Sequence, residues 1–575
     1  MSKRELSPSA LPPPKRAHTT NNRGTIRSLP LNFDNSLYDE LILCIFSHLS
    51  WVDLCMTQST SRNWARLAAD NELWRHIFIK VYGRTRLRGA KGFIGRLDGR
   101  EIMPMPGRVT KSEPVKNWKW MFRISSNWRK GMVQIFYCRC AVEEFKGDLH
   151  NTHEDPNSSS SSATSHDQTH VVLVGPLTIT ASTALTTAPF LQLTTVNGDN
   201  HIIPLDKPQN QPVAVSTLAL DQSPPVSSHI SLVACMSTGD FHIIKVNPSS
   251  PALFSRVLGY RPPQRSSRAL PIIRAAFYHP LLVTLASDFT LSLFDLSDGA
   301  VQRTQTLTSF SSYPPASLVL SSPSPTAFKL VLAYAVPVYP RHWSVGAAEL
   351  IIARTSQPWT SQHSLTSSFK EDYIHGSSSH LTVVSSRAIR AFEVPSGWID
   401  ENSLRTMREQ WGRKLCSVAD VQTDGKWVVL APGDEFLSDE HSVSSGSASP
   451  INGSSTPMEL RLHSPTALQL YRLVLPSHSS SVSASPPKLN FVRTLHGQTS
   501  PISAIALSDG RCVSLGQNGS IWVWDLEGGT GAEVAPADDF VIEHKMQAGR
   551  GTVAFDERRI VSAHAGRVVI RRFDI

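Results

Sequence analysis

The stretch Ser36–Trp74, SLYDELILCIFSHLSWVDLCMTQSTSRNWARLAADNELW, decides the fold of the N-terminal part of the chain. Leu41, Ile45 and Leu49 repeat at i, i+4 and i+8, which is the spacing of one apolar helix face. A capping box at residues 50–53 separates this first helix from the second, and two further helical patterns follow. About forty residues are too few to bury so much apolar surface by themselves. We therefore expect another protein to cover part of it.

The segment resembles an F-box, the adaptor-binding module of substrate receptors in cullin-RING (SCF) ubiquitin ligases. The matching positions are Asp39-Glu40-Leu41, Ile45-Phe46, Leu49, Asp53-Leu54, Arg62, Trp64 and Leu73-Trp74. Tyr38 replaces the usual Pro, and Thr60-Ser61 replaces the usual Val-Cys. An ordinary helical hairpin, in which the apolar stripe is simply core, is the alternative.

The resemblance implies that these helices bind a Skp1-type adaptor and, through it, a cullin and a RING subunit. The side chains expected at the adaptor contact are Leu41, Ile45, Phe46, Leu49, Leu54, Trp64 and Trp74. Some of them must instead hold the helices together, and the sequence alone does not separate the two sets.

Positive charge is concentrated in the N-terminal quarter of this 575-residue chain. The whole chain has 56 Lys and Arg against 47 Asp and Glu, but residues 1–131 have 23 against 10. Basic residues that gather into a surface patch attract nucleic acid or anionic lipid. Here the basic residues are scattered among Gly, Pro and Trp, so we favour a solvated linker and expect neither nucleic acid nor membrane partners.

Motifs for catalysis or for a bound cofactor are missing from the sequence. There is no Walker loop, no dinucleotide-binding glycine pattern, no nucleophile elbow and no zinc-protease motif. The seven Cys form no C-x-x-C pair, and the 21 His are dispersed. We expect a non-enzymatic protein without cofactor or metal. The cysteine usage and the absence of an apolar leader point to the cytoplasm, the nucleus or both.

After residue 131, short apolar and β-branched runs alternate with turn residues, which predicts an all-β region. The clearest unit, Leu495–Leu526, resembles a WD40 repeat that ends in Trp524-Asp525. Gln498 and Asn518 occupy the positions of the buried His and Asp of that repeat. We therefore expect this unit to lack the ionic network and to depend more on apolar packing.

Weaker copies of the unit end in an aromatic residue followed by an acid, and one lies at Leu381–Val394. The expected blade-closing residues are Phe294, Asp295, Trp524, Asp525, Phe573 and Asp574. The aromatic would fill the space between blades and the acid would face the loop. Repeats of this kind stack radially until a ring closes, which predicts a propeller of seven or eight blades. A pair of β-sandwiches is the competing fold.

The chain as a whole is predicted to be a multidomain α plus all-β protein. Its expected parts are a disordered tail at 1–28, an F-box and following helix at 29–83, a basic neck and helical linker at 84–131, and a WD40-like β-propeller at 132–575. Disordered insertions are expected near 151–170, 436–458 and 476–487. Trp118, Phe122 and Trp128 would pack the linker, and the strand Val133–Val142 would pair with the C-terminal strands.

The order of these parts resembles that of a fungal-like F-box protein with a degenerate WD40-type propeller. It implies a substrate-recognition subunit of an SCF ubiquitin ligase, whose propeller holds a protein target for ubiquitination and proteasomal degradation. A scaffold that acts outside the ligase is the alternative. Whether the target is phosphorylated stays open, and the arginines considered for phosphate recognition are Arg387, Arg390, Arg567, Arg571 and Arg572.

Overall fold

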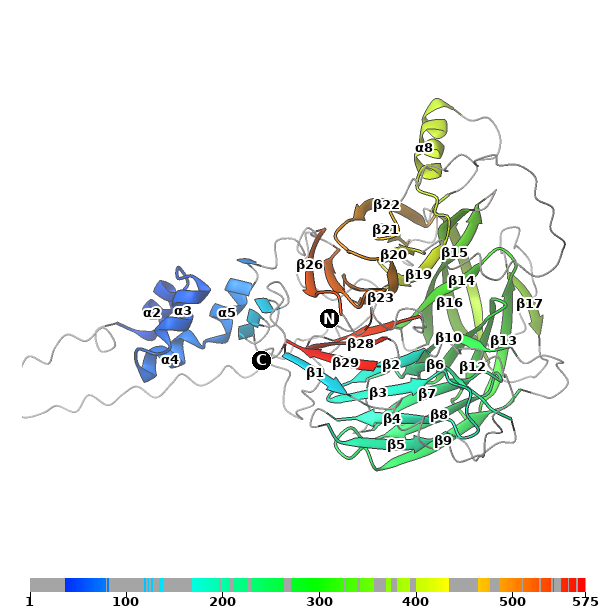
Figure 1. Cartoon of the computed structure of the whole chain (residues 1–575), viewed down its shortest axis with the longest axis horizontal. Helices are drawn as coiled ribbons and strands as arrows, with labels where there is room; N and C mark the ends of the chain where they lie inside the picture. The colour runs from blue at the N-terminus through cyan, green and yellow to red at the C-terminus, as the bar shows by residue number, and fades with distance from the viewer. Residues whose placement is uncertain are drawn as a thin grey trace, which may run out of the picture. The chain divides into compact units, whose positions relative to one another are not determined.

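The computed structural model divides the chain into two compact units, residues 1–79 and 80–575, which are taken separately below (Figure 1). It describes residues 37–78, 80–81, 118–119, 122–123, 126–127, 134–138, 168–195, 198–205, 211–224, 229–262, 270–324, 326–338, 342–355, 369–373, 380–392, 400–433, 464–475, 486–508, 510–526, 529–538, 541, 550–556, 558–564 and 567–573. The predicted tail at 1–28 and the insertion at 436–458 lie outside these residues, as does most of the basic neck.

Four short helices make up the described part of the first unit. They are α2 (Asp39–Phe46), α3 (Trp51–Thr57), α4 (Arg62–Ala68) and α5 (Asn71–Phe78). A polar side chain starts α3, where the Ser50 hydroxyl accepts the Asp53 N–H at 3.2 Å, and another starts α4, where Ser61 does the same for Trp64. These caps satisfy amide groups that have no partner inside the helix. The predicted N-cap at Ser50 is confirmed, and α4 packs against both α2 and α3.

The second unit contains seven β-sheets within the residues that the structure describes. We number them as blades in chain order. Blade 1 contains β2 (Thr169–Val174), β3 (Leu177–Ser182), β4 (Phe190–Thr194) and β5 (Asn200–Pro204). Blade 2 contains β6 (Val215–Leu220), β7 (Ile230–Met236), β8 (Phe241–Val246) and β9 (Phe254–Tyr260). Blade 3 contains β10 (Ile272–Tyr278), β11 (Leu281–Ala286), β12 (Thr290–Asp295), β13 (Gln302–Ser309) and β17 (Phe369–Tyr373).

The other four blades follow the same plan. Blade 4 contains β14 (Tyr313–Ser324), β15 (Ala327–Val338), β16 (His342–Thr355) and β18 (His380–Arg390). Blade 5 contains β19 (Val418–Thr423), β20 (Trp427–Pro432), β21 (Leu468–Val474) and β22 (Lys488–Leu495). Blade 6 contains β23 (Ile502–Ser508), β24 (Arg511–Gly516), β25 (Ile521–Asp525) and β26 (Thr530–Ala535). Blade 7 contains β27 (Thr552–Phe555), β28 (Arg559–His564), β29 (Arg567–Arg572) and β1 (Gln134–Cys138).

The first strands of the blades form a closed ring. Contacts run from β2 to β6, β10, β14, β19, β23 and β27 in turn, and from β27 back to β2. Closure of this ring packs neighbouring blades against one another and leaves only short, protected sheet edges at the axis. The predicted β-propeller is therefore confirmed and has seven blades, whereas the alternative of two β-sandwiches is wrong.

Blade 7 joins the two ends of the propeller sequence. β1 pairs antiparallel with β29, with Phe136 opposite Ile570, so a strand that precedes blade 1 completes the last blade (Figure 1). This pairing was expected from Val133–Val142. Because a strand from one end of the domain is bonded to strands from the other end, the ring cannot open without breaking a β-ladder.

Two expectations about blade 4 and the insertions need correction. Leu381–Val394 was expected to form a repeat copy, but its described part contains one long strand, β18, at the edge of blade 4. The insertion expected at 151–170 ends earlier, because Thr169 and His170 already belong to β2. Residues 151–167 and 476–485 lie outside the described residues.

A helix, α8 (Glu401–Trp411), lies between blades 4 and 5 in the chain and extends away from the sheets (Figure 1). None of its residues is buried. Across the described ranges, no helix combines the length and the apolar content that crossing a membrane requires.

Candidate functional site

The expected adaptor-binding residues separate into two groups in the N-terminal unit. Phe46, Leu54 and Trp74 are buried in the helix bundle. Phe46 packs edge-on against Trp64, with 5.5 Å between ring centroids, and the Trp74 indole donates a hydrogen bond to the Ala68 carbonyl at 2.7 Å. These side chains hold the helices together, and Leu49 and Trp64 are partly buried.

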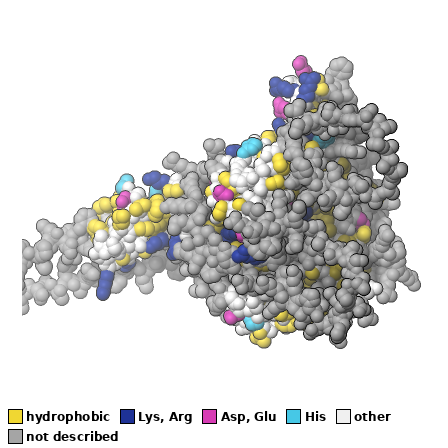
Figure 2. Space-filling model, viewed as in Figure 1, with side chains coloured by type: hydrophobic (Ala, Val, Ile, Leu, Met, Phe, Trp, Pro, Cys, Tyr) yellow, Lys and Arg dark blue, Asp and Glu magenta, His cyan; other side chains and the backbone are white. Residues whose placement is uncertain are grey.

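The second group faces solvent on α2. Leu41 is 50% exposed and Ile45 is 44% exposed. Val52 and Met56 repeat the same i, i+4 spacing on α3 and are also exposed. Hydrophobic side chains are visible on the surface of this unit in Figure 2. Sequence reasoning missed Val52 and Met56, although their spacing was a usable signal.

One residue near the end of the expected linker is hydrogen-bonded to the propeller. Trp118 and Phe122 are buried, whereas Trp128 lies outside the described residues. The Asn127 amide donates a hydrogen bond to the Phe573 carbonyl at 2.8 Å, next to the end of β29. The polypeptide is therefore anchored to blade 7 just before β1.

The three expected blade-closing aromatic residues lie between neighbouring blades. Phe294 packs in a cluster shared by blades 2 and 3, and Trp524 in one shared by blades 5 and 6. Phe573 packs between blades 6 and 7. Each ring lies in a hydrophobic cluster to which both neighbouring sheets contribute.

The acids that follow these aromatic residues differ from one another. Asp295 is buried, accepts the Ser297 N–H at 3.0 Å, and forms an ion pair with Arg354 of blade 4 at 3.1 Å. It therefore orders the loop and also joins two blades, which is more than the loop-facing role expected. Asp525 is partly buried, and Asp574 lies outside the described residues.

Blade 6 contains a buried hydrogen-bond network, although this blade was expected to depend more on apolar packing. The Trp524 indole donates to the Ser514 hydroxyl at 2.9 Å, and Ser514 donates to the Gln498 carbonyl oxygen at 2.7 Å. The Gln498 amide then donates to Ser520, whose hydroxyl donates to Asn518, at 2.8 and 2.7 Å. The network contains no ionic pair, as expected, but its neutral amides satisfy the same donors and acceptors as the pair they replace, so the blade depends less on apolar packing than expected.

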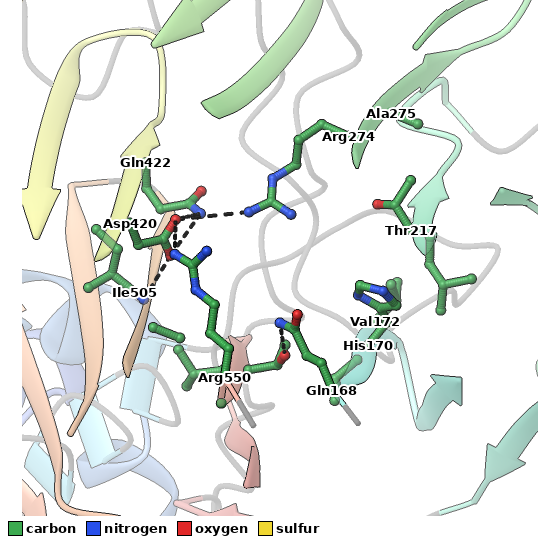
Figure 3. A pocket seen from close by; sticks show the side chains of 16 residues that line it. Gln168, His170, Val172, Thr217, Arg274, Ala275, Asp420, Gln422, Ile505 and Arg550 are labelled. Atoms are coloured by element: carbon green, nitrogen blue, oxygen red, sulfur yellow. Dashed lines mark hydrogen bonds and ion pairs between the residues drawn. The ribbon is translucent and has the colours of Figure 1, made fainter. Parts of the chain in front are cut away.

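A cavity of about 220 Å³ lies at the axis of the propeller, inside the ring of first strands (Figure 3). Residues of β2, β6, β10, β19 and β23 line it, together with β27 and the residues just before it. Its polar side chains include Gln168, His170, Thr217, Arg274, Asp420 and Arg550. We call this space the central cavity.

A repeated backbone irregularity precedes the lining residues. The pairing of the first strand with the second shifts register between Val215 and Thr217 in blade 2, and between Ile272 and Arg274 in blade 3. Blades 5 and 6 have the same shift, before Asp420 and Ala504 respectively. A β-bulge changes the direction of the side chains that follow it. In these four blades the residue that directly follows the shift, Thr217, Arg274, Asp420 or Ala504, lines the cavity.

Two guanidinium groups converge on one carboxylate in the central cavity. The Asp420 Oδ1 atom lies 3.9 Å from Nη2 of Arg274 and 3.7 Å from Nη2 of Arg550. Asp420 is buried, and its carboxylate also accepts the N–H groups of Ile505 at 3.1 Å and Val421 at 2.9 Å. The carboxylate is therefore held in place by the backbone, whereas both guanidinium groups are only loosely paired with it.

Arg274 is fixed to the wall, whereas Arg550 is more open. The Arg274 Nε donates to the Ala316 carbonyl at 2.9 Å, and 35% of the side chain is exposed. Burial lowers the pKa of Arg274, the charge of Asp420 opposes this shift, and the charge of Arg550 adds to it. The Arg550 side chain is 44% exposed, so solvent reaches this end of the cavity.

His170 forms part of the same wall. Burial, and then the positive charge of Arg274, lower its pKa to about 4, so the imidazole is neutral at pH 7. Its Nε2 atom is buried and has no hydrogen-bond partner among the described residues. Among the described residues that line the cavity, the charged side chains are those of Arg274, Arg550 and Asp420.

The arginines considered from the sequence are not those of the central cavity. Arg387 and Arg390 lie on β18, and Arg567, Arg571 and Arg572 lie on β29. β18 is the outermost strand of blade 4 and β29 is the third strand of blade 7, so neither lines the axis. A signal for the actual residues was present, since Arg274 and Asp420 are single charges within apolar strands. A charge in such a run needs a partner or a function.

Comparisons with known proteins agree with the two units. A family model described as F-box-like matches residues 36–80, and a model described as F-box protein pof12 beta-propeller matches residues 197–549. The chain is also similar to an F-box protein of Saccharomyces cerevisiae, with 26% identity over 131 residues. That match spans 21% of this chain and 19% of the relative, or about a fifth of the relative's length.

Two solved structures resemble the propeller unit at low similarity. The beta-propeller domain of Cps50 (Swd1) from Myceliophteria thermophila aligns with a TM-score of 0.36 and 10% identity, over 71% of this chain and 96% of that one. The computationally designed Ika8 protein aligns with a TM-score of 0.32 and 12% identity, over 70% and 82%. Neither likeness is high enough to carry an argument.

The family can nevertheless be assigned. The propeller model matches more than half of the chain, the F-box-like model matches the helices before it, and the seven blades follow in the expected order. This chain belongs to the F-box protein pof12 beta-propeller family.

Proposed function

We propose that the protein is the substrate-recognition subunit of an SCF ubiquitin ligase. In this proposal the helices of the first unit bind a Skp1-type adaptor, which links them to a cullin and a RING subunit. The propeller binds the protein to be ubiquitinated. The division of labour follows the expected domains at 29–83, 84–131 and 132–575, and the protein would act in the cytoplasm, the nucleus or both.

The exposed apolar side chains of α2 and α3 carry the adaptor half of the proposal. Leu41, Ile45, Val52 and Met56 remain exposed although the bundle has a separate buried core. A protein that keeps a group of large apolar side chains in water usually covers them with a partner. The match of residues 36–80 to the F-box-like model supports an adaptor as that partner.

The propeller half of the proposal requires no bond chemistry from this chain. A receptor raises the local concentration of its target near the enzyme that transfers ubiquitin, so the gain comes from proximity and orientation. Anchoring of the segment before β1 supports this role, because the Asn127 amide is hydrogen-bonded to the Phe573 carbonyl of the propeller. We assign the central cavity to binding rather than to catalysis.

Affinity purification of the tagged full-length chain tests the proposal. Adaptor, cullin and RING subunit should be recovered together, and all three should be lost from a variant carrying Leu41→Asp and Ile45→Asp. A Leu404→Asp variant on α8 is the control, since Leu404 is also apolar and exposed but belongs to the propeller unit. Recovery of the adaptor without any cullin would contradict the ligase role and favour a scaffold. Proximity labelling with and without proteasome inhibition would then identify targets.

A further inference from the structure

The central cavity has an excess of hydrogen-bond donors. Arg274 and Arg550 together present far more N–H groups than the single Asp420 carboxylate can accept. The carboxylate is also occupied by the N–H groups of Ile505 and Val421. In Figure 3 both arginine side chains point toward Asp420 from different blades. Donors thus remain for an acceptor that enters from solvent.

The charge of the cavity suits a singly charged anion. Two guanidinium groups and one carboxylate leave one net positive charge, and the neutral His170 adds none at pH 7. A carboxylate carries one negative charge, whereas a phosphate monoester carries about 1.5 to 2 at this pH. Asp420 repels the additional charge of a phosphate across a short distance. The arrangement therefore favours a carboxylate.

The size of the cavity limits the ligand further. Its volume of about 220 Å³ is below the range of roughly 300–1,000 Å³ that is typical of sites for drug-sized molecules. One side chain or one chain terminus fits such a space, but a folded element does not.

We propose that the central cavity binds a carboxylate group of the protein substrate, held by Arg550 and Arg274 beside Asp420. The carboxylate comes from an acidic side chain or from the C-terminus of the substrate. This inference rests on the proposed function, because it names the chemical group that the propeller recognises. Arg274 and Asp420 each follow a bulge in the first strand of their blade, and their side chains meet at 3.9 Å.

The test measures peptide binding to the purified full-length protein without adaptor. Four pools of short random peptides are compared by fluorescence anisotropy: an amidated pool with one fixed Glu, an amidated pool with Gln at that place, an amidated pool with phosphoserine there, and the Gln pool with a free C-terminus. We expect either the Glu pool or the free-terminus pool to bind more tightly than the amidated Gln pool. The pool that does so identifies the source of the carboxylate.

Variants locate the binding in the cavity. Arg550→Gln removes a partly exposed guanidinium and should weaken carboxylate binding by on the order of ten- to a hundredfold, as loss of a charge-assisted hydrogen bond does. Arg387→Gln, on the outer strand β18, should leave it unchanged. Asp420→Asn raises the net charge by one and should shift preference toward the phosphoserine pool. Unfolding curves of each variant check the fold.

Three results would overturn the inference: equal binding of the charged and neutral pools, binding that survives Arg550→Gln, or wild-type preference for phosphoserine. The affinity purification of the adaptor is independent of these measurements. A protein that recovers the whole ligase but shows no carboxylate preference would retain the proposed function and lose this inference. The reverse result would retain the site and lose the ligase role.

Discussion

Truncating the exposed stripe of α2 should weaken adaptor binding without unfolding the helices. Leu41 and Ile45 are about half exposed in the free protein, and covering a whole aliphatic side chain is worth about 1.5–3 kcal/mol. Covering the remaining half of both therefore contributes about 1.5–3 kcal/mol together. The double variant Leu41→Ala, Ile45→Ala should bind a purified Skp1-type adaptor roughly ten- to a hundredfold more weakly.

Truncating the buried face should act by another route. Phe46 is buried and packs against Trp64, and removing a buried Phe side chain costs about 3–5 kcal/mol. A bundle this small has little stability to lose. Phe46→Ala should therefore abolish binding because the helices unfold.

Two measurements on the full-length chain separate these routes. Biolayer interferometry gives the affinity for the adaptor, and hydrogen exchange with mass spectrometry reports on residues 39–78. The double variant should keep native exchange protection, whereas Phe46→Ala should lose it. The reasoning is refuted if the double variant binds like wild type with intact protection, or if it unfolds like Phe46→Ala. Leu404→Ala on α8 controls for loss of any exposed apolar group.

Three more predictions concern the propeller. Ser514→Ala leaves the Trp524 indole and Gln498 without their shared hydrogen-bond partner. The free energy of unfolding in urea should fall by about 1–3 kcal/mol. The control variant Ser255→Ala, at an exposed position, should leave it unchanged. Burial lowers the pKa of His170 to about 4, so the unfolded chain binds more protons than the native chain between pH 6.5 and 4. The free energy of unfolding should therefore fall as the pH drops through this window. The fall should be up to about 3 kcal/mol larger in the wild type than in His170→Gln. Equal pH profiles for the two proteins would contradict that assignment. The double variant Ile135→Pro, Phe136→Pro should break the β1–β29 ladder, because proline has no N–H group to donate. Hydrogen exchange of the β29 amides should then become faster. Unchanged exchange in β29 would mean that β1 does not close the ring.

Local sequence patterns were sufficient to predict the helices and strands and most of their order along the chain. Helical spacing and the Ser50 cap located the N-terminal helices, and turn residues with aromatic-acid pairs located most blades. Both signals act over a few residues, so a single sequence contains them. The prediction of a repeat copy at Leu381–Val394 failed for the same reason, because a strand at the edge of a blade has the same local pattern as a repeat copy.

Long-range arrangement was what the sequence could not supply. Whether Leu41 faces water while Phe46 is buried depends on how three other helices pack, and both residues carry the same helical signal. The number of blades depends on which strands become neighbours when the ring closes. Arg274, Asp420 and Arg550 lie far apart in the sequence, and only the ring of first strands with its bulges brings their charges together. Spacing along a chain determines local structure, whereas a site assembled from different blades exists only after the chain has closed on itself.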